Sequence, residues 1–313
     1  MAKCDFVISL TTADNDYQAL QAASAEEAAR RLGVALQIIH AQNDPIVQSQ
    51  QLLKIVQSPP EVRPRAILFE PAGGTAHPQV AQAAASAGIA CAVLNREADY
   101  TASLRRSSRL PFFSITSDHE EVGRIQGRQL AAILPKGGAV LYIEGPSQSL
   151  AAKQRTAGMN QTRPSTLEIK TMRGQWTEES GHRAISSWLR LSTSQRSQFD
   201  AVAAQDDSMA MGARKAFQEL TDAGARDRWL ALPFLGCDGG PESGQAWVRR
   251  GLLAATVVIP ANAGQALELL VRAFQTGALP PERTLTVPTS FPALDAIAAD
   301  HAAKLRALSA SRG

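Results

Sequence analysis

Short apolar runs alternate with longer stretches of mixed polar and apolar residues along most of this chain. The runs that predict strands are Phe6–Leu10, Ala35–His40, Ala66–Phe69, Cys91–Leu94, Phe112–Ile115, Ala139–Ile143, Leu167–Thr171, Phe199–Ala203, Leu232–Leu235 and Ala254–Val258. Most of the segments between them have a helical pattern, such as Tyr17–Gly33, which ends on a glycine as helices often do. Strands that alternate with helices predict βαβ units and parallel sheets.

The number of predicted strands indicates two lobes. The strands fall into two sets of about five, which suits two doubly wound parallel sheets better than one sheet of about ten strands. The length of 313 residues also exceeds the usual size of a single domain, and a hydrophobic content of 44% is enough for sizeable cores. The expected fold is therefore α/β, with two Rossmann-like lobes.

The composition argues against several classes of protein. The formal charge is only +3 and the basic residues are scattered, which argues against a nucleic-acid surface. The three cysteines, Cys4, Cys91 and Cys237, form no CxxC pair, so neither a disulfide framework nor a zinc site is expected. The five histidines show no metal-ligand spacing; we interpret them as surface or turn residues, with His119 at a helix start. No Walker loop and no GxSxG, HExxH or GxGxxG motif is present.

The amino terminus shows no export signal. It contains no apolar stretch of signal-peptide length, and no run of about 18 apolar residues could span a bilayer. As written, the chain is therefore expected to be cytoplasmic, or periplasmic if a leader has been removed. No membrane insertion is expected.

Polar residues follow almost every predicted strand. Ligands of doubly wound sheets bind beyond the carboxyl ends of the strands, so a site is expected at these positions. The polar stretches are Thr11–Tyr17, Glu70–Gly74, Asn95–Glu97, Ser117–Gly123, Glu144–Ser149, Gln205–Ser208 and Cys237–Gly244. Aromatic rings fit the C–H faces of a sugar, and amides, carboxylates and guanidinium groups fit its hydroxyls. These residue types indicate a small hydroxylated ligand.

Two adjacent carboxylates, Asp206 and Asp207, stand between an apolar run and a helical pattern. Neighbouring residues point in different directions, so the two do not form a pair that could flank one glycosidic bond. We interpret Asp207 as the N-cap of the helix that follows. A ligand contact and a cap both remain open for Asp206.

Seven motifs, taken in order, cover nearly the whole chain: ADNDY, LNRE, TSDHEEVGRIQGRQL, AAKQRTAGM, AAQDDSMAMGARKAF, LGCDGG and GLLAATVVIPANAGQAL. Together they resemble the type 1 periplasmic sugar-binding proteins of the ribose-binding branch, which is related to the effector domain of the lactose-repressor family. The resemblance implies two lobes, residues 1–117 with 258–287 and residues 118–257 with 288–313. It also implies three hinge crossings and a ligand cleft between the lobes. No helix-turn-helix segment precedes Phe6, so no nucleic-acid partner is expected.

In the first lobe, the resemblance assigns ligand contacts to Asn15, Tyr17, Asn95 and Arg96. Glu70, which replaces a neutral residue of the family, is a further candidate. Other roles remain open for these residues. Asn15 could form an Asx-turn or a helix cap, and Tyr17 could simply begin its helix. Arg96 could form a surface ion pair, and Glu70 could face a hinge partner.

In the second lobe, the resemblance assigns ligand contacts to Arg155, Trp176, Asp206 and Asp238. Arg155 could instead pair with Glu144, and Asp238 could order a glycine-rich turn. Trp176 has polar neighbours, which favours the cleft over the core.

Three residues depart from the ribose-binding pattern. Asn95 replaces the aspartate of a family Asp-Arg pair, and Asp206 stands where ribose binders have asparagine. The later glutamine of the family, after AAT, has no clear counterpart in VVIPAN, which weighs against ribose itself, and Glu70 adds to that. Glu70 with Asp206 would equally suit an amine-bearing ligand.

The predicted function is that of a solute-binding protein that closes around a sugar or polyol, as the substrate-binding component of an ABC transporter. A membrane permease is then the expected protein partner. One alternative is a cytoplasmic sugar sensor that docks on a signalling protein, and a second is a sugar-modifying enzyme. No cofactor is expected, and no metal.

Overall fold

The computed structural model describes residues 5–73, 76–192, 194 and 197–300. They divide into two compact units. Unit 1 lies within Met1–Ser117 and Pro260–Thr286, and unit 2 lies within Asp118–Ile259 and Val287–Gly313. The chain therefore passes from one unit to the other three times. Its second segment in unit 1 covers residues 260–286, compared with 258–287 in the sequence-based expectation.

Unit 1 contains a six-stranded sheet with the order β11-β5-β4-β3-β1-β2, in which every neighbouring pair is parallel. Its elements are β1 (Phe6–Leu10), α1 (Asp16–Leu32), β2 (Leu36–His40), α2 (Pro45–Val56), the 3-10 helix η1 (Pro60–Val62), β3 (Ala66–Phe69), α3 (Pro78–Ser86), β4 (Ala90–Leu94), α4 (Thr101–Ser108), β5 (Phe112–Ser117), α11 (Ala263–Thr276) and β11 (Arg283–Thr286).

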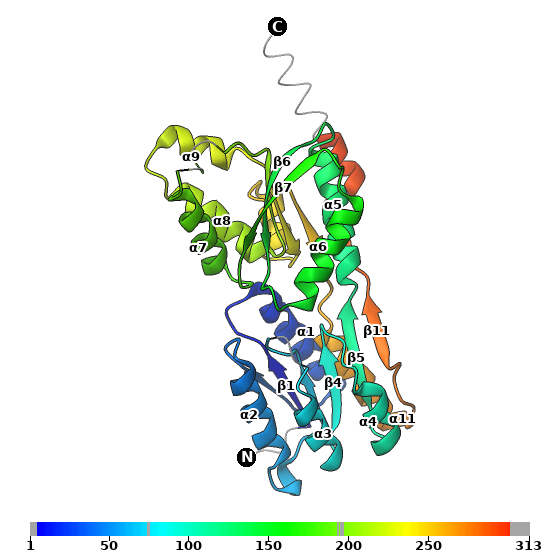
Figure 1. Cartoon of the computed structure of the whole chain (residues 1–313). Coiled ribbons are helices and arrows are strands. Elements are labelled where there is room, and N and C mark those ends of the chain that lie inside the picture. Colours follow the sequence, from blue (N-terminus) through cyan, green and yellow to red (C-terminus); the bar gives the residue numbers. More distant parts are fainter. Residues whose placement is uncertain (1–4, 74–75, 193, 195–196, 301–313) are drawn as a thin grey trace. The chain divides into compact units, whose positions relative to one another are not determined.

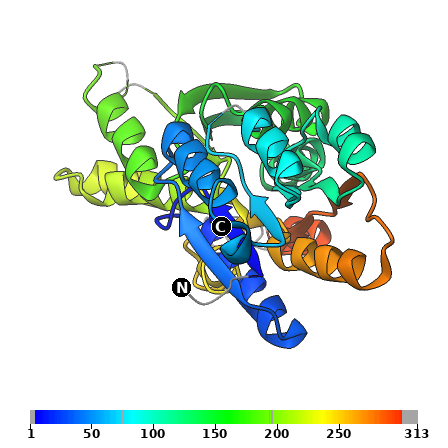
Figure 2. The same ribbon diagram turned by 90° about the horizontal axis from the view of Figure 1, so that it is seen from below.

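Helices cover both faces of the unit 1 sheet because successive strand residues point to opposite faces. Phe6 and Ile8 of β1 pack in one core with residues of α1 and α11. Ile67 and Phe69 of β3 pack in a second core with residues of α2, α3 and α4. Figure 2 shows helices of this unit on both sides of its strands. These four strand residues are fully buried, as expected for parallel strands covered on two sides.

Helix α1 begins and ends at the residues that the pattern indicates. Asn15 caps its first turn, and Gly33 follows its last residue with φ 66°. In this left-handed conformation the N–H of Gly33 reaches the carbonyls of Ala29 and Arg30. The predicted helix, which ends on this glycine, is confirmed.

Unit 2 contains a second six-stranded sheet, with the order β12-β10-β9-β8-β6-β7, in which only β12 is antiparallel to its neighbour. Its elements are α5 (His119–Ile133), β6 (Gly138–Glu144), α6 (Leu150–Thr162), β7 (Leu167–Arg173), α7 (Glu178–Leu189), β8 (Ala201–Ala204), α8 (Asp207–Gln218), α9 (Ala223–Leu230), β9 (Phe234–Asp238), α10 (Gly244–Arg249), β10 (Ala255–Val258) and β12 (Thr289–Phe291).

The unit 2 sheet is also covered on both faces. Leu141 and Ile143 of β6 pack with residues of α7 and α8, whereas Val140 and Tyr142 pack with residues of α5 and α6. Figure 1 shows the two helix pairs on opposite sides of β6 and β7. The predicted α/β fold with two mainly parallel sheets is confirmed, and each sheet has one short strand, β11 or β12, that the sequence did not predict.

Candidate ligand-binding site

The strand order of unit 1 brings together polar residues that are far apart in the sequence. Strands β4, β3 and β1 are neighbours in the sheet. Glu70 directly follows β3, Asn95 directly follows β4, and Asn15 directly precedes α1 in the connection from β1. All three therefore belong to the carboxyl edge of this sheet, where doubly wound folds bind ligands.

Asn15 and Tyr17 hold the start of α1. Oδ1 of Asn15 accepts a hydrogen bond from the backbone N–H of Gln18 over 3.1 Å, so Asn15 caps the helix. The hydroxyl of Tyr17, in the first turn, donates to the carbonyl of Pro260 over 3.3 Å and accepts from Nε2 of Gln21 over 3.2 Å. The cap and the helix start are confirmed, and a ligand contact for either residue stays a prediction.

Glu70 is a buried carboxylate held by two side-chain amides. Nε2 of Gln18 donates to its Oε2 over 3.0 Å, and Nδ2 of Asn95 donates to its Oε1 over 3.1 Å. Gln18 is oriented in turn by the backbone N–H of Thr11, which donates to its Oε1 over 3.1 Å. Gln18 is not among the predicted site residues, although an amide in the first turn of the helix after a strand is a usable signal.

Arg96 lies beside Asn95 at the same edge and is partly buried. Its Nη1 donates to the backbone carbonyl of Asn95 over 2.8 Å. The next residue, Glu97, forms a surface ion pair with Arg283 over 2.5 Å. The guanidinium of Arg96 is thus held against the end of β4, and its contact with a ligand stays a prediction.

At the carboxyl edge of the unit 2 sheet, three predicted residues meet. Arg155, from α6, lies with Nη1 3.6 Å from Oδ1 of Asp238 and with its guanidinium carbon 5.3 Å from the ring centroid of Trp176. Nη1 also donates to the backbone carbonyl of Gln205. Glu144, the other partner considered for Arg155, is 3.3 Å from Arg173 and accepts from Thr156 over 2.8 Å.

The indole ring of Trp176 lies against the backbone after β6. A side chain at Gly145 would begin only 2.1 Å from the ring, so the close approach requires glycine at this position. Trp176 is partly buried and touches the hydrophobic core of unit 2. The ring therefore contacts both that core and the guanidinium of Arg155, a cation–π arrangement.

Asp206, rather than Asp207, caps α8. Oδ1 of Asp206 accepts from the backbone N–H of Met209 over 2.6 Å, so Asp206 caps α8. The prediction that Asp207 is the cap is wrong because the helix begins one residue earlier, at Asp207 itself. Asp207 accepts instead from the hydroxyl of Thr256 and from the backbone N–H of Gly239, each over 2.7 Å.

Asp207 is a buried carboxyl group with a structural role, and its side chain packs against β9 and β10. It is 2% exposed, and burial raises its pKa well above the ordinary value, with the nearby charge of Asp238 acting in the same direction. Its hydrogen bond to Gly239 holds the turn that follows Asp238. Asp207 thus positions the end of β9 for its neighbours.

Gln205 belongs to a polar stretch that the sequence places at this edge, but no function was predicted for it. It is fully buried, and its Nε2 lies within hydrogen-bond distance of Tyr142, Ala152 and Thr156. Its Oε1 accepts from the backbone N–H of Gly145 over 2.9 Å. Gln205 therefore ties β6, α6 and the carbonyl that binds Arg155 into one network, and its position directly after an apolar strand is the signal for it.

Three of the predicted site residues have left-handed backbone conformations. The φ angles are 56° for Asn95, 63° for Trp176 and 100° for Asp238. Such values are uncommon for residues other than glycine and persist only where surrounding contacts hold them, most often at functional sites. The strain supports a functional role for the two strand edges.

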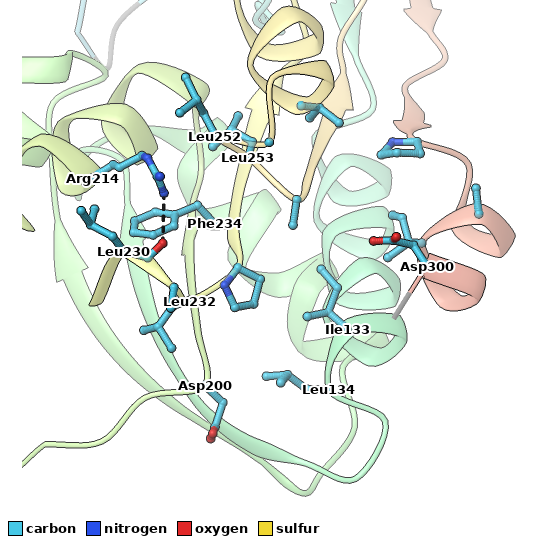
Figure 3. Close-up of a pocket in the computed structure, with 18 residues that line it drawn as sticks. Ile133, Leu134, Asp200, Arg214, Leu230, Leu232, Phe234, Leu252, Leu253 and Asp300 are labelled. Carbon is cyan, nitrogen blue, oxygen red and sulfur yellow. Dashed lines mark hydrogen bonds between the residues drawn. The ribbon is translucent and has the colours of Figure 1, made fainter. Parts of the chain in front are cut away.

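A cavity of about 580 Å³ lies elsewhere in unit 2 (Figure 3). Its lining includes Asp200, Pro233 and Ala254, which directly precede β8, β9 and β10, so it lies at the amino ends of these strands. Arg214 donates to the carbonyl of Leu230 over 3.4 Å there, as Figure 3 shows, and burial lowers its pKa. The cavity is thus at the opposite edge of the sheet from Arg155 and Asp238.

Two further expectations concern histidines and metals. His119 begins α5 behind the cap Asp118, as predicted, and His77 lies in the connection just before α3. Both are buried, at 4% and 6% exposure, so neither is a surface residue. Burial lowers the pKa of His77. His301 lies outside the described residues. Within the described ranges, no group of three His, Cys, Asp or Glu side chains is placed to hold a metal ion.

None of the helices in the described part of the chain is both long and apolar enough to cross a bilayer.

Two α/β units, each with strained polar residues at the carboxyl edge of a parallel sheet, define a binding protein of the periplasmic type. The sequence matches the family described as periplasmic binding protein domain over residues 6–277. That match covers most of the chain, so the chain belongs to this family, whose members are binding proteins rather than enzymes. The resemblance to type 1 periplasmic sugar-binding proteins is confirmed.

Individual relatives agree with this assignment. The ribose import binding protein of Salmonella typhimurium is 26% identical over 257 residues, which cover 82% of this chain and 79% of that protein. A protein of Rhizobium meliloti named for rhizopine binding is 27% identical over 216 residues, 67% of this chain and 66% of its own length, so the chain spans slightly less than two thirds of that relative.

The fold is also that of solved structures. An ABC transporter periplasmic solute binding protein from Actinobacillus succinogenes 130z, with bound D-allose, has a TM-score of 0.77 at 21% identity. The alignment covers 92% of this chain and 97% of that one. At this identity the likeness shows the fold.

Proposed function

We propose that the chain is the substrate-binding component of an ABC transporter and binds a small hydroxylated molecule, a sugar or polyol. The observation that carries the proposal is the meeting of Arg155, Asp238 and Trp176 at one strand edge. A guanidinium and a carboxylate offer charge-assisted hydrogen bonds to hydroxyl groups, and the indole offers a face for C–H groups. Relatives named for ribose and rhizopine, and a solved structure with D-allose, support this class of ligand.

The proposal includes contacts from both units, through Asn15, Asn95 and Arg96 in unit 1 and Arg155, Trp176, Asp206 and Asp238 in unit 2. A ligand that contacts two units shifts a population towards the closed conformation, because only that conformation makes both sets of contacts. The partner would be a membrane permease that recognises the closed form. Transport also implies that the working protein lies in the periplasm, and that it releases its ligand without chemical change.

A thermal-shift screen tests the proposal. The purified chain would be heated with pentoses, hexoses, cyclitols, amino sugars and nucleosides, and each ligand would be recovered and weighed by mass spectrometry. A ligand at about a thousand times its dissociation constant stabilises the folded form by roughly 4 kcal/mol. This raises the unfolding midpoint by several degrees, since about 1 kcal/mol corresponds to roughly 2–4 °C. A shift from one class, with unchanged mass, supports the proposal, and a converted ligand or no shift from any class contradicts it.

A further inference from the structure

Glu70 is a buried carboxylate held by two neutral side-chain amides. It is 4% exposed, and the side-chain atoms that hydrogen bond to its carboxylate are the amide nitrogens of Gln18 and Asn95. Among the residues that the structure describes, no lysine, arginine or histidine forms an ion pair with it. A buried carboxylate without a cation is unfavourable unless a partner completes its surroundings.

In the side-chain hydrogen bonds around Glu70, the amides donate and the carboxylate accepts. A backbone N–H can only donate, so the contact from Thr11 means that Gln18 accepts with Oε1 and donates with Nε2. Nε2 then donates to Glu70. On the other side, Asn95 must also present its NH2 group, because its oxygen would meet another acceptor there. Both carboxylate oxygens therefore accept, as expected for the ionised form.

With the amide nitrogens used as donors, the atoms of Glu70 and Asn95 that can still form hydrogen bonds are acceptors. An ionised carboxylate has about four lone-pair positions, of which the two amides use one on each oxygen. Oδ1 of Asn95, the atom left when its nitrogen donates to Glu70, is buried and has no hydrogen-bond partner among the described residues. Oε1 and Oε2 of Glu70 and Oδ1 of Asn95 thus form a cluster, the acceptor cluster, with no donor of its own.

The acceptor cluster is held firmly in place. The backbone N–H of Glu70 donates to the carbonyl of Ser9 over 2.9 Å, and its carbonyl accepts from Nε2 of Gln48 over 2.8 Å. Oε1 of Gln48 accepts from the N–H of Ala72 over 2.7 Å, which closes the loop after β3. At Asn95 the left-handed backbone orients the amide. A fixed geometry of this kind selects one chemical group, because the acceptors cannot turn away from a poor match.

We propose that the ligand carries a protonated amine and that the acceptor cluster of Glu70 and Asn95 binds it. An ammonium group has three donors and no acceptor, so it matches three acceptor atoms, whereas a hydroxyl brings one donor and two further acceptors. The positive charge of the ammonium group also balances the negative charge of the Glu70 carboxylate. The inference rests on the proposed function and narrows its ligand class to amino sugars and amino cyclitols.

Matched ligand pairs test the inference on the wild-type chain. The pairs are D-glucosamine with D-glucose, D-galactosamine with D-galactose and scyllo-inosamine with scyllo-inositol, measured by titration calorimetry at pH 6.5. The N-acetylated form of each amino sugar serves as an uncharged third member. The amine is expected to bind at least about tenfold more tightly than its hydroxyl partner in the pair that fits, because a hydrogen bond to a charged group contributes about 1.5–3 kcal/mol.

Two variants separate Glu70 from a general effect of charge. Glu70→Gln keeps the shape of the side chain and is expected to bring the amine-to-hydroxyl affinity ratio close to one. Glu97→Gln removes the same charge from an exposed residue of the same edge and is expected to leave the ratio unchanged. Unfolding of each variant without ligand confirms that it is folded.

Each result decides a different point. If the hydroxyl partner binds as tightly as the amine, the inference is overturned and the sugar-binding function stands. If the amine is preferred but Glu70→Gln keeps the preference, the assignment to Glu70 is overturned. If no member of any pair binds but an amine-free ligand raises the unfolding midpoint in the thermal-shift screen, the inference is overturned and the proposed function stands. If nothing in the screen binds either, the proposed function fails, and the inference fails with it.

Discussion

The guanidinium of Arg155 and the carboxylate of Asp238 lie 3.6 Å apart, with side chains only 5% and 12% exposed. Neither charge is well solvated, so each depends on the other and on polar groups nearby, such as the Gln205 carbonyl. The pair therefore links the stability of unit 2 to the candidate site. A ligand that contacts one member also acts on the other.

Arg155→Met is expected to weaken both folding and binding. The substitution leaves Asp238 buried without its cation, which should lower the free energy of unfolding by about 3 kcal/mol, and ligand affinity should fall at least about tenfold. Urea unfolding and calorimetry measure the two effects. Arg183→Met is a matched control, because the Arg183–Glu179 pair is 64% and 74% exposed and should contribute less than about 1 kcal/mol. Equal losses in the two variants would contradict the role given to Arg155.

Asp207→Asn is expected to change how stability depends on pH. Its carboxyl has a folded-state pKa well above the ordinary value of 3.8, so the folded chain holds this proton to higher pH than the unfolded chain does. The stabilising contribution of the protonated group is complete below pH 3.8 and is lost as pH rises through the folded-state pKa.

Asparagine cannot lose that proton, yet it still accepts from Gly239 and can donate to Thr256. The stability of Asp207→Asn relative to wild type should therefore rise with pH above about 4, by up to roughly 1.4 kcal/mol per pH unit. Urea unfolding at a series of pH values from 4 to 8 measures the difference. A difference that stays constant over this range would show that Asp207 does not titrate as described.

Gly158→Ala is expected to separate α5 from α6. A side chain at Gly158 would begin 1.9 Å from the backbone oxygen of Glu120, and backbone cannot yield as a flexible side chain does. We expect a loss of about 1–3 kcal/mol in the free energy of unfolding, together with weaker ligand binding, since α6 carries Arg155.

The control for this substitution is Gly224→Ala in α9. The nearest atom to a side chain there is Oδ1 of Asp222 at 3.4 Å, an ordinary contact, so alanine should be neutral or stabilise the protein by up to about 1 kcal/mol. Thermal unfolding of both variants decides the point. A Gly158→Ala chain as stable as Gly224→Ala would mean that the helices can separate without cost.

Most of the strands that the sequence predicts bury apolar side chains on both faces, although the half-exposed edge strands β2 and β7 are also among them. Residues 6–10 and 66–69 are fully buried runs, and such runs are visible in a single sequence. Strands β11 and β12 were missed because they have only four and three residues, and Leu285 and Phe291 are their single apolar residues. Pairing with β5 and β10 makes them strands, and a sequence pattern does not reveal such pairing.

The candidate site could be predicted in part. Ligands bind beyond the carboxyl ends of parallel strands, and the polar stretches after the predicted strands contain Glu70, Asn95, Asp206 and Asp238. The contacts between them depend on which strands are neighbours and on helix boundaries. Because α8 begins one residue earlier than predicted, Asp206 is its N-cap and Asp207 is buried. The contact of Gln18 with Glu70 crosses from α1 to the end of β3, so only the folded chain shows it.

Calorimetric titration of the purified chain with the best ligand from the thermal-shift screen tests the central claim most directly. The account predicts saturable binding of one molecule per chain, loss of affinity in Arg155→Met but not in Arg183→Met, and recovery of the ligand with unchanged mass. No saturable heat with any hydroxylated ligand, or a ligand that leaves the chain chemically altered, would contradict it.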